Sequence, residues 1–308
     1  MGLPEPWQNS FNVVLRFFDA IRGRLLMAKI SHVMDTALWV AYHRGQESLQ
    51  AQPLYRDPLA LKLAGELGER ISARMSSATF MSWMMALRTK AIDGLIDDAV
   101  KDGVRLIVNL GAGLDTRPYR LALPEGVRWI EVDFPQMISY KDKLLQAETP
   151  TVSLKRVSLD LGDRGKAREF YQSLSREDGP ILVITEGVIP YLDRVAVEAL
   201  AQDLFAIPNI KYWIQDFRHG GYAQGFAKLW LKYKLRRAPM KFKVGHWFDF
   251  FARFGWRMRK QRLMSDLSAE FGRSMPTGGS IGLLMAIFPK KKLEAYNRSS
   301  GFVMFERG

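Results

Sequence analysis

Hydrophobic and polar positions alternate with two different periods along this chain of 308 residues. Before residue 104, apolar residues recur every three or four positions, which is the period of a helix that buries one face. From residue 104 onward, short apolar runs alternate with helical stretches. We therefore predict a helical cap region over residues 1–103 and a sheet-containing region over residues 104–308, joined in one integrated domain.

Four segments of the first region are expected to be helices. Phe11–Ile30 and Phe80–Val100 carry apolar residues at helical spacing, and Asp35–Gln50 is a third candidate. A fourth helix is expected to begin at Asp57-Pro58, because proline suits the first helical turn. These helices come before the first predicted strand, so we expect them to cap a ligand site or to shape a pocket beside it.

Seven apolar runs are expected to form a sheet. They are Arg105–Leu110, Arg128–Val132, Leu154–Leu159, Ile181–Thr185, Lys211–Phe217, Trp256–Arg259 and Gly282–Phe288. Strands that alternate with helices form a parallel sheet with helices on both faces. The predicted fold class is therefore α/β, with a doubly wound, mostly parallel sheet of seven strands. Residues 220–247 interrupt the alternation after the fifth strand. Their basic and aromatic residues predict an inserted helical lid with a basic face.

Composition narrows the classes of protein and site. The chain has no cysteine, which excludes disulfides, zinc-thiolate sites and a cysteine nucleophile, and we predict no metal site. Charged residues interrupt the N-terminal apolar stretch, and no segment approaches the roughly 18 apolar residues of a spanning helix. We expect a soluble, cytoplasmic protein. The formal net charge of +13 favours anionic partners, although a solvated basic surface explains it equally well.

A glycine turn and a later acid form the most informative pair of features. The run Leu106–Leu110 ends in Gly111 and Gly113, and Asp133 ends the next run 22 residues after Gly111. In a doubly wound sheet, such glycines let the backbone approach a ligand, and such an acid accepts from ribose hydroxyls. Thr116 occupies the place of the third glycine that a dinucleotide pyrophosphate needs. S-adenosylmethionine (SAM) has no pyrophosphate, so we predict SAM as cofactor and S-adenosylhomocysteine (SAH) as its product.

The alternatives are a plain strand-to-helix turn at the glycines and, for Asp133, a cap on the helix that follows Pro135. Glu131 shares a strand face with Asp133 but lies deeper in the sheet, so we expect it to be less able to reach a ligand.

Three ordered segments resemble the leucine carboxyl methyltransferase family. They are Asn109–Arg117, Glu131–Pro135 and Thr185–Leu192, and the earlier Asp35–Ala37 and Tyr55–Pro58 resemble the N-terminal helical region of that family. The resemblance extends from about residue 35 to residue 192, and the last third of the chain matches only in outline. It implies a class I, Rossmann-like SAM methyltransferase. The family includes many bacterial O-methyltransferases that act on small molecules and polyketides.

The resemblance also implies cofactor-binding roles by position. Arg88 matches an arginine that pairs with the SAM carboxylate, and Asp160 with Leu161 matches the pair at the adenine. Guanidinium binds carboxylate in bidentate geometry, which suits the first role. We also assign Asp115, within the glycine turn, to the cofactor site. The competing interpretations are a solvated helix arginine and a turn-forming aspartate.

Three further residues are expected near the reacting groups. Glu186 follows the fourth strand, where it could accept from the SAM ammonium or face the acceptor, and burial would require a cationic partner. Tyr191 lies nearby as a candidate pocket or catalytic residue, although a core tyrosine is an equal alternative. His219, after the fifth strand, is the best candidate for a general base, although a lone histidine is more often structural.

One departure from the family bears on the substrate. Protein-methylating members carry a cofactor lysine shortly after the early aspartate, and the segment Leu38–Tyr42 has none. We therefore predict an O-methyltransferase that acts on a hydroxyl or carboxylate of a small, apolar or acidic metabolite, polyketide-like or lipid-like, in secondary metabolism. The basic lid could attract this acceptor or rest on an anionic membrane.

Four other functions remain as alternatives. They are a protein C-terminal carboxyl methyltransferase, a nucleic-acid methyltransferase, a nicotinamide oxidoreductase and a non-catalytic, membrane-associated protein of the same fold. No nucleic-acid partner is expected, because the Asn/Asp-Pro-Pro-aromatic motif of base amino-methylases is missing after the fourth predicted strand.

Overall fold

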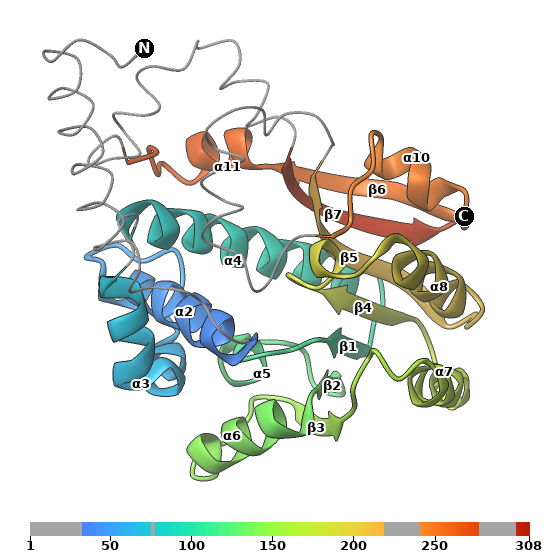
Figure 1. The fold of residues 1–308 in the computed structure, drawn as a ribbon, viewed down its shortest axis with the longest axis horizontal. Helices are drawn as coiled ribbons and strands as arrows, with labels where there is room; N and C mark the ends of the chain where they lie inside the picture. Colours follow the sequence, from blue (N-terminus) through green and yellow to red (C-terminus); the bar gives the residue numbers. More distant parts are fainter. Residues whose placement is uncertain (1–32, 75–77, 219–240, 277–299) are drawn as a thin grey trace, which may run out of the picture.

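The fold was analysed in a computed structural model that describes residues 33–74, 78–218, 241–276 and 300–308 (Figure 1). The predicted helix Phe11–Ile30 lies outside the described residues. The helices are α2 (Val33–Gln46), α3 (Pro58–Ala73), α4 (Ala78–Lys101), α5 (Arg117–Arg120), α6 (Pro135–Leu145), α7 (Arg164–Ser173), α8 (Arg194–Phe205), α10 (Trp247–Ala252) and α11 (Met264–Glu270). Three 3-10 helices are η1 (Glu47–Leu49), η2 (Leu174–Arg176) and η3 (Ile189–Tyr191). None of the helices described here has the length and apolarity needed to cross a bilayer.

The strands in the described residues form one sheet of seven. They are β1 (Leu106–Leu110), β2 (Arg128–Asp133), β3 (Ser153–Ser158), β4 (Ile181–Thr185), β5 (Ile210–Arg218), β6 (Trp256–Leu263) and β7 (Ser300–Arg307). Their order is β3-β2-β1-β4-β5-β7-β6, and Figure 1 shows them in succession from β6 at the top to β3 at the bottom. Strands β1 to β5 are parallel, whereas β7 is antiparallel to both β5 and β6. The predicted doubly wound, mostly parallel sheet is confirmed.

One strand of the described sheet is not predicted by the sequence pattern. Ser300–Arg307 forms β7 between β5 and β6, whereas the expected seventh strand, Gly282–Phe288, lies outside the described residues. The rule that helices separate successive strands applies to parallel neighbours. β7 is antiparallel to β5 and β6, so the rule does not apply to it and does not predict its position.

Both faces of the central strands β1 and β4 are buried, as the doubly wound pattern requires. Along β1, Leu106, Val108 and Leu110 belong to a core with α7, α8 and α10, while Ile107 belongs to a core with α4 and α11. Successive side chains point to opposite faces of a strand, so a strand buried on both faces is apolar throughout. Within the predicted cap region, α4 is therefore a helix that covers the sheet directly.

The helices α2 and α3 pack on the glycine turn that follows β1. Arg44 of α2 donates to Leu114 O at 2.5 Å, and Leu38 and Leu63 share a small core with Leu114. The N-terminus of α3 is fixed as predicted: Pro58 occupies its first turn, and Asp57 accepts from Ala60 N at 3.1 Å. The turn is thereby held between the sheet and the cap helices.

Candidate functional site

The site is built where the strand order reverses. β1 and β4 are neighbours, yet the chain runs outward from β1 through β2 to β3 and from β4 to β5. Ligands of doubly wound sheets bind at such a switch point, beyond the carboxyl ends of the strands. The residues that follow β1 and β4 are Gly111 and Glu186. Two predicted site residues thus flank the switch point.

The glycine turn needs glycine at both positions. Gly111 has φ of 70° and Gly113 has φ of 50°, in the left-handed region that other residues avoid. A Cβ on Gly111 would lie 2.5 Å from Val188 Cγ2, and one on Gly113 would lie 3.9 Å from Ala37 Cβ. The turn is therefore pressed between the loop after β4 and the start of α2.

Asp133 closes this turn from the end of β2. Its Oδ2 accepts from Gly113 N at 2.6 Å, and its Oδ1 accepts from Phe134 N at 2.7 Å. Burial raises the pKa of Asp133, although these two backbone bonds oppose the shift. Each carboxylate oxygen has a second lone pair, so Asp133 can still accept from the two hydroxyls of a ribose.

Glu131 takes no part in this arrangement. It is fully buried and paired with Lys141 at 2.6 Å and Arg156 at 2.8 Å, as expected for an acid deeper in the sheet.

Asp160 and Leu161 lie beyond the end of β3, next to Asp133 in the sheet. Leu159 N donates to Asp133 O at 2.9 Å, which brings the two strand ends together. Asp160 is exposed and accepts from Gly162 N at 2.7 Å, as a turn-forming aspartate does. Leu161 is half-buried against the core. The two interpretations of Asp160 are compatible, because the turn leaves its other oxygen available.

Glu186 has the cationic partners that its burial requires. Arg88 Nε lies 2.6 Å from Glu186 Oε1, without the alignment of a hydrogen bond, and Arg117 Nη1 donates to Glu186 Oε2 at 2.7 Å. Arg88 Nη2 is also 3.3 Å from Asp216 Oδ1 at the end of β5. The predicted cofactor arginine is therefore held here by two carboxylates of the protein.

These groups continue into a chain of buried charges that we call the buried ion network. Its members are Asp216, Arg88, Glu186, Arg117, Asp115, Asp93, Arg120, Asp57 and Arg44. Arg117 is the central member, because its guanidinium contacts Asp93, Asp115 and Glu186 at 2.7–2.8 Å. The network joins α2, α4 and α5 to the ends of β4 and β5, so cap and sheet meet through paired charges.

Burial and pairing act in opposite directions on these acids. Burial raises the pKa of Glu186, but Arg117 and Arg88 outweigh it, so the pKa is lowered overall. The pKa of Asp115 is lowered in the same way, with burial opposed chiefly by Arg117. Asp216 behaves differently: burial raises its pKa, and Arg88 only partly offsets the shift. The site therefore combines two carboxylates that are stabilised in the ionised form, Glu186 and Asp115, with a more basic one, Asp216.

Asp115 is engaged by protein donors on both oxygens. Asn109 Nδ2 and Arg117 Nη1 donate to Oδ2 at 2.9 and 2.8 Å, and Arg117 N donates to Oδ1 at 3.0 Å. Through these contacts, Asp115 holds the glycine turn against α5. Its predicted contact with the cofactor stays a prediction.

The predicted catalytic residues have different outcomes. Tyr191 ends η3 and is half-buried, and burial raises its pKa, with Asp216 adding to the shift and Arg88 opposing it. Its hydroxyl is thus neutral at pH 7 and can donate but not act as a base. His219 and most of the predicted lid, residues 219–240, lie outside the described residues. The predicted lid ends at Trp247, which begins α10 and is buried in the core with α7 and α8.

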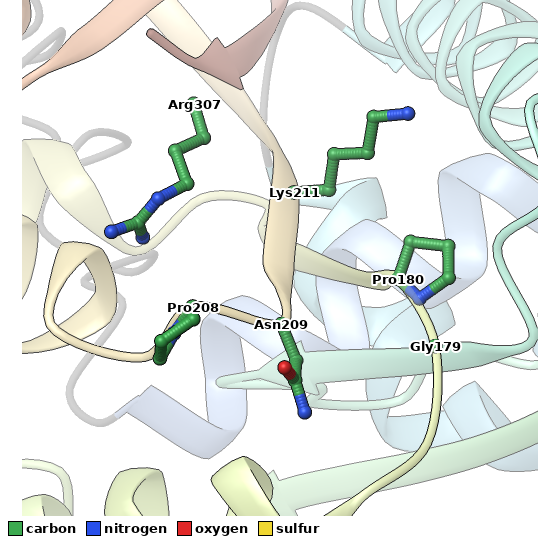
Figure 2. Close-up of a pocket in the computed structure, with 6 residues that line it drawn as sticks. All are labelled: Gly179, Pro180, Pro208, Asn209, Lys211 and Arg307. Carbon is green, nitrogen blue, oxygen red and sulfur yellow. The ribbon is translucent and has the colours of Figure 1, made fainter.

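A pocket at the opposite edge of the sheet is not a comparable site. Figure 2 shows it between the segments that lead into β4 and β5, with a cavity volume of about 280 Å³. Arg307 donates there to Phe205 O at 2.6 Å and stacks on the Phe205 ring, and Asn209 Nδ2 donates to Glu177 O at 2.5 Å. These polar groups tie neighbouring loops together at the amino ends of the strands.

Sequence reasoning missed most of the buried ion network. No local pattern marks Arg44, Asp57, Asp93 or Arg120 as a site residue, and Arg117 stands out only as the end of the Asn109–Arg117 motif. For Asp216 a usable feature existed, because it is an acid at the end of a predicted strand, like Asp133.

Comparison with known proteins identifies similar chains. The family model described as leucine carboxyl methyltransferase matches residues 37–205. A protein of Frankia alni, provisionally named an S-adenosyl-L-methionine-dependent methyltransferase, is 32% identical over 272 residues, which cover 82% of this chain and 92% of that protein. A Streptomyces coelicolor protein with the same provisional name is 29% identical and covers 83% of this chain and 96% of its own length.

Two solved structures share the fold. A DUF574 family protein from Streptomyces avermitilis has a TM-score of 0.53 at 14% identity, covering 87% of this chain and 97% of that one. A provisionally named methyltransferase from Thermobifida fusca also has a TM-score of 0.53, at 12% identity, covering 92% and 97%. At these identities the likeness concerns the fold alone, and it agrees with the predicted class I methyltransferase sheet.

Proposed function

This chain belongs to the leucine carboxyl methyltransferase family, and from that membership we propose that it is a SAM-dependent O-methyltransferase of a small apolar or acidic metabolite. The observation that carries the proposal is the meeting of three features at one switch point. They are the glycine turn after β1, Asp133 at the end of β2 and the Glu186–Arg88 pair beside β4. Their positions at this edge of the sheet support the roles in SAM binding that we propose for them.

The residues present fit SAM better than a dinucleotide. Gly111 and Gly113 leave the turn without side chains, and Thr116, where a third glycine would stand, is buried and donates to Asp57 at 2.5 Å. Asp133 offers acceptors for ribose hydroxyls, and Leu161 offers an apolar surface beside an adenine. Thr36 Oγ1, at the start of α2 near the turn, is buried and has no hydrogen-bond partner among the described residues. A bound ligand would supply that partner.

Charge supports the same conclusion. The buried ion network holds five carboxylates and four guanidinium groups, so its fully ionised form has an excess of one negative charge. SAM carries a sulfonium and an ammonium against one carboxylate, and therefore a net positive charge. Glu186 is suited to the ammonium, and Arg88 to the carboxylate.

When bound, SAM supplies an electrophilic methyl group. The residues of this chain then have to hold an acceptor oxygen in line with the S–C bond and keep water out. The loop Glu186–Tyr191 and α4 border the methionine side of the predicted site. Tyr191 can donate a hydrogen bond to an acceptor oxygen from that loop.

Calorimetry tests the cofactor assignment without knowledge of the acceptor. The wild-type protein is titrated with SAM and SAH and compared with Asp133→Ala and with Asp97→Ala. Asp97 is 58% exposed on α4 and, within the part of the chain that the structure describes, pairs with Lys101 alone, so it serves as the matched control. Loss of hydrogen bonds to a charged group costs about 1.5–3 kcal/mol, which corresponds to roughly 10- to 100-fold weaker binding.

We expect that loss in Asp133→Ala and unchanged affinity in Asp97→Ala. A wild-type protein that does not bind SAM would refute the proposal. A radiolabelled methyl assay against phenols, alcohols and carboxylic acids then identifies the acceptor class.

A further inference from the structure

Asp216 lies one strand beyond the predicted cofactor residues. Across the carboxyl edge of the sheet, the order of strands places Asp160, Asp133, Gly111, Glu186 and Asp216 in succession. Under the proposed function, the first three surround the adenosine and Glu186 meets the methionine part. The next strand end, β5, is then on the side from which a methyl acceptor approaches.

One oxygen of Asp216 is held and the other is not. Oδ2 accepts from Gly187 N at 2.6 Å. Oδ1 lies 3.3 Å from Arg88 Nη2 but receives no hydrogen bond from the described residues, although the atom is buried. A buried acceptor without a donor is costly, so a ligand that donates a proton here would be favoured.

We propose that the methyl acceptor is a neutral hydroxyl compound, a phenol or an alcohol, and that Asp216 accepts its proton. The inference rests on the proposed function. The acceptor oxygen forms a bond to the methyl carbon while the S–C bond breaks and its electron pair passes to sulfur, giving the thioether SAH. The hydroxyl proton passes to Asp216 Oδ1, and the product is a methyl ether.

The surroundings of Asp216 favour a hydroxyl over a carboxylate acceptor. Arg88 from α4 already faces Asp216 and Glu186, and the proposed function assigns it to the SAM carboxylate, so it is not available to pair with a carboxylate acceptor as well. Among the described residues, Tyr191 and Arg218 are the other ionisable groups that face Asp216. A carboxylate placed between Glu186 and Asp216 would meet like charges on both sides, whereas a hydroxyl can donate to Oδ1.

The same surroundings suit Asp216 to proton transfer. Burial raises the pKa of Asp216 and Glu186 adds to the shift, while Arg88, the Gly187 N–H and Arg218 oppose it. A carboxylate with a raised pKa is a stronger base than an ordinary one. The alternative is that Asp216 only positions Arg88. In that case its replacement would lower the affinity for SAM and would not specifically affect proton transfer.

Asp216→Asn separates the two roles, because it keeps the shape of the side chain but cannot take a proton from a hydroxyl. Asp97→Asn is the matched control. SAM affinity is measured by calorimetry, and methyl transfer is measured from pH 5 to 9 with 4-octylphenol, 1-decanol and 4-octylbenzoate. Binding of the same three probes to the SAH-loaded protein is measured in parallel.

We expect Asp216→Asn to bind SAM within threefold of the wild type. Transfer to a hydroxyl probe should fall by about 10²- to 10⁴-fold, the usual contribution of a general base, and lose the rise with pH seen in the wild type. The Asn variant should also bind the hydroxyl probes more weakly, since a strong acceptor is lost.

Three results overturn the inference while leaving the proposed function intact. They are a tenfold or larger loss of SAM affinity in Asp216→Asn, preferential methylation or binding of 4-octylbenzoate, and a wild-type protein that binds SAM but neither binds nor methylates any hydroxyl probe. Failure of the wild type to bind SAM refutes the proposed function itself, so the two failures are distinguishable.

Discussion

Replacing Arg117 by methionine tests whether the buried ion network stabilises the fold around the site. Arg117 is 1% exposed, and its guanidinium contacts Asp93, Asp115 and Glu186. Breaking a buried ion pair costs about 3–5 kcal/mol of unfolding free energy, because a carboxylate is left buried without compensation.

Here the cost should lie at the low end of that range. Asp93 keeps Arg120 at 2.6 Å, Asp115 keeps Asn109 at 2.9 Å, and Glu186 keeps Arg88 at 2.6 Å. Methionine also fills most of the volume of the arginine stem, so the packing loss is small. We expect Arg117→Met to lower the unfolding free energy by about 3 kcal/mol.

Urea denaturation followed by circular dichroism measures this loss, and Arg128→Met is the control. The Arg128–Glu177 pair is also short, at 2.6 Å, but its side chains are 45% and 28% exposed, so it should contribute less than about 1 kcal/mol. Equal, small losses of unfolding free energy in the two variants would refute the reasoning, because the buried ion pairs of Arg117 would then stabilise the fold no more than the exposed Arg128–Glu177 pair does.

The difference between wild type and Arg117→Met should depend on pH. The pKa values of Glu186 and Asp115 are lowered in the folded protein, where burial opposes the shift and Arg117 causes it. Their contribution is present above the unfolded-state values near pH 4–4.5 and is lost as the pH falls below them. A stability difference that stays constant down to pH 3 would contradict this account.

Two further predictions concern the glycine turn and a buried histidine. Gly111→Ala combines positive φ with a Cβ 2.5 Å from Val188, whereas Gly126→Ala has positive φ and open space around its Cβ. Only Gly111→Ala should weaken SAM binding in calorimetry, and it should lower the unfolding free energy by clearly more than the roughly 1–2 kcal/mol expected from positive φ alone. Equal losses of unfolding free energy in the two variants would show that the contact with Val188 relaxes freely. Burial lowers the pKa of His43 from 6.5 to about 4, so only the unfolded chain gains a proton in that interval. Stability should fall by about 3 kcal/mol as the pH drops from 6.5 to about 4, and urea denaturation of the wild type but not of His43→Gln should show this component.

Local rules predicted the parallel half of the fold because they act within short segments. The apolar run Leu106–Leu110 with its two glycines, and the run that ends at Asp133, were enough to predict two strands and the turn between sheet and cap. The start of α3 at Asp57-Pro58 followed from the preference of proline for the first helical turn. The strand Ser300–Arg307 could not be predicted in this way, because its place between β5 and β6 depends on partners distant in sequence.

Local sequence rules also could not predict which charged residues pair with one another at the site. The need of Glu186 for a cation followed from its expected burial, and the structure confirms it. The identity of that cation did not, since Arg88 and Arg117 lie 98 and 69 residues away in the sequence. Only the packing of α4 and α5 against the end of β4 brings these side chains together.

The position of β7 determines the order in which the strands of the sheet can pair during synthesis of the chain. In the described sheet β6 pairs only with β7, and β7 is made after β6 during translation. Among the described strands, the basic strand β6 therefore has no neighbour until Ser300–Arg307 leaves the ribosome and inserts beside β5. The half of the sheet that presents Asp216 is thus completed last, and loss of these eight residues would remove the described partner of β6 and expose one edge of β5, which would still pair with β4.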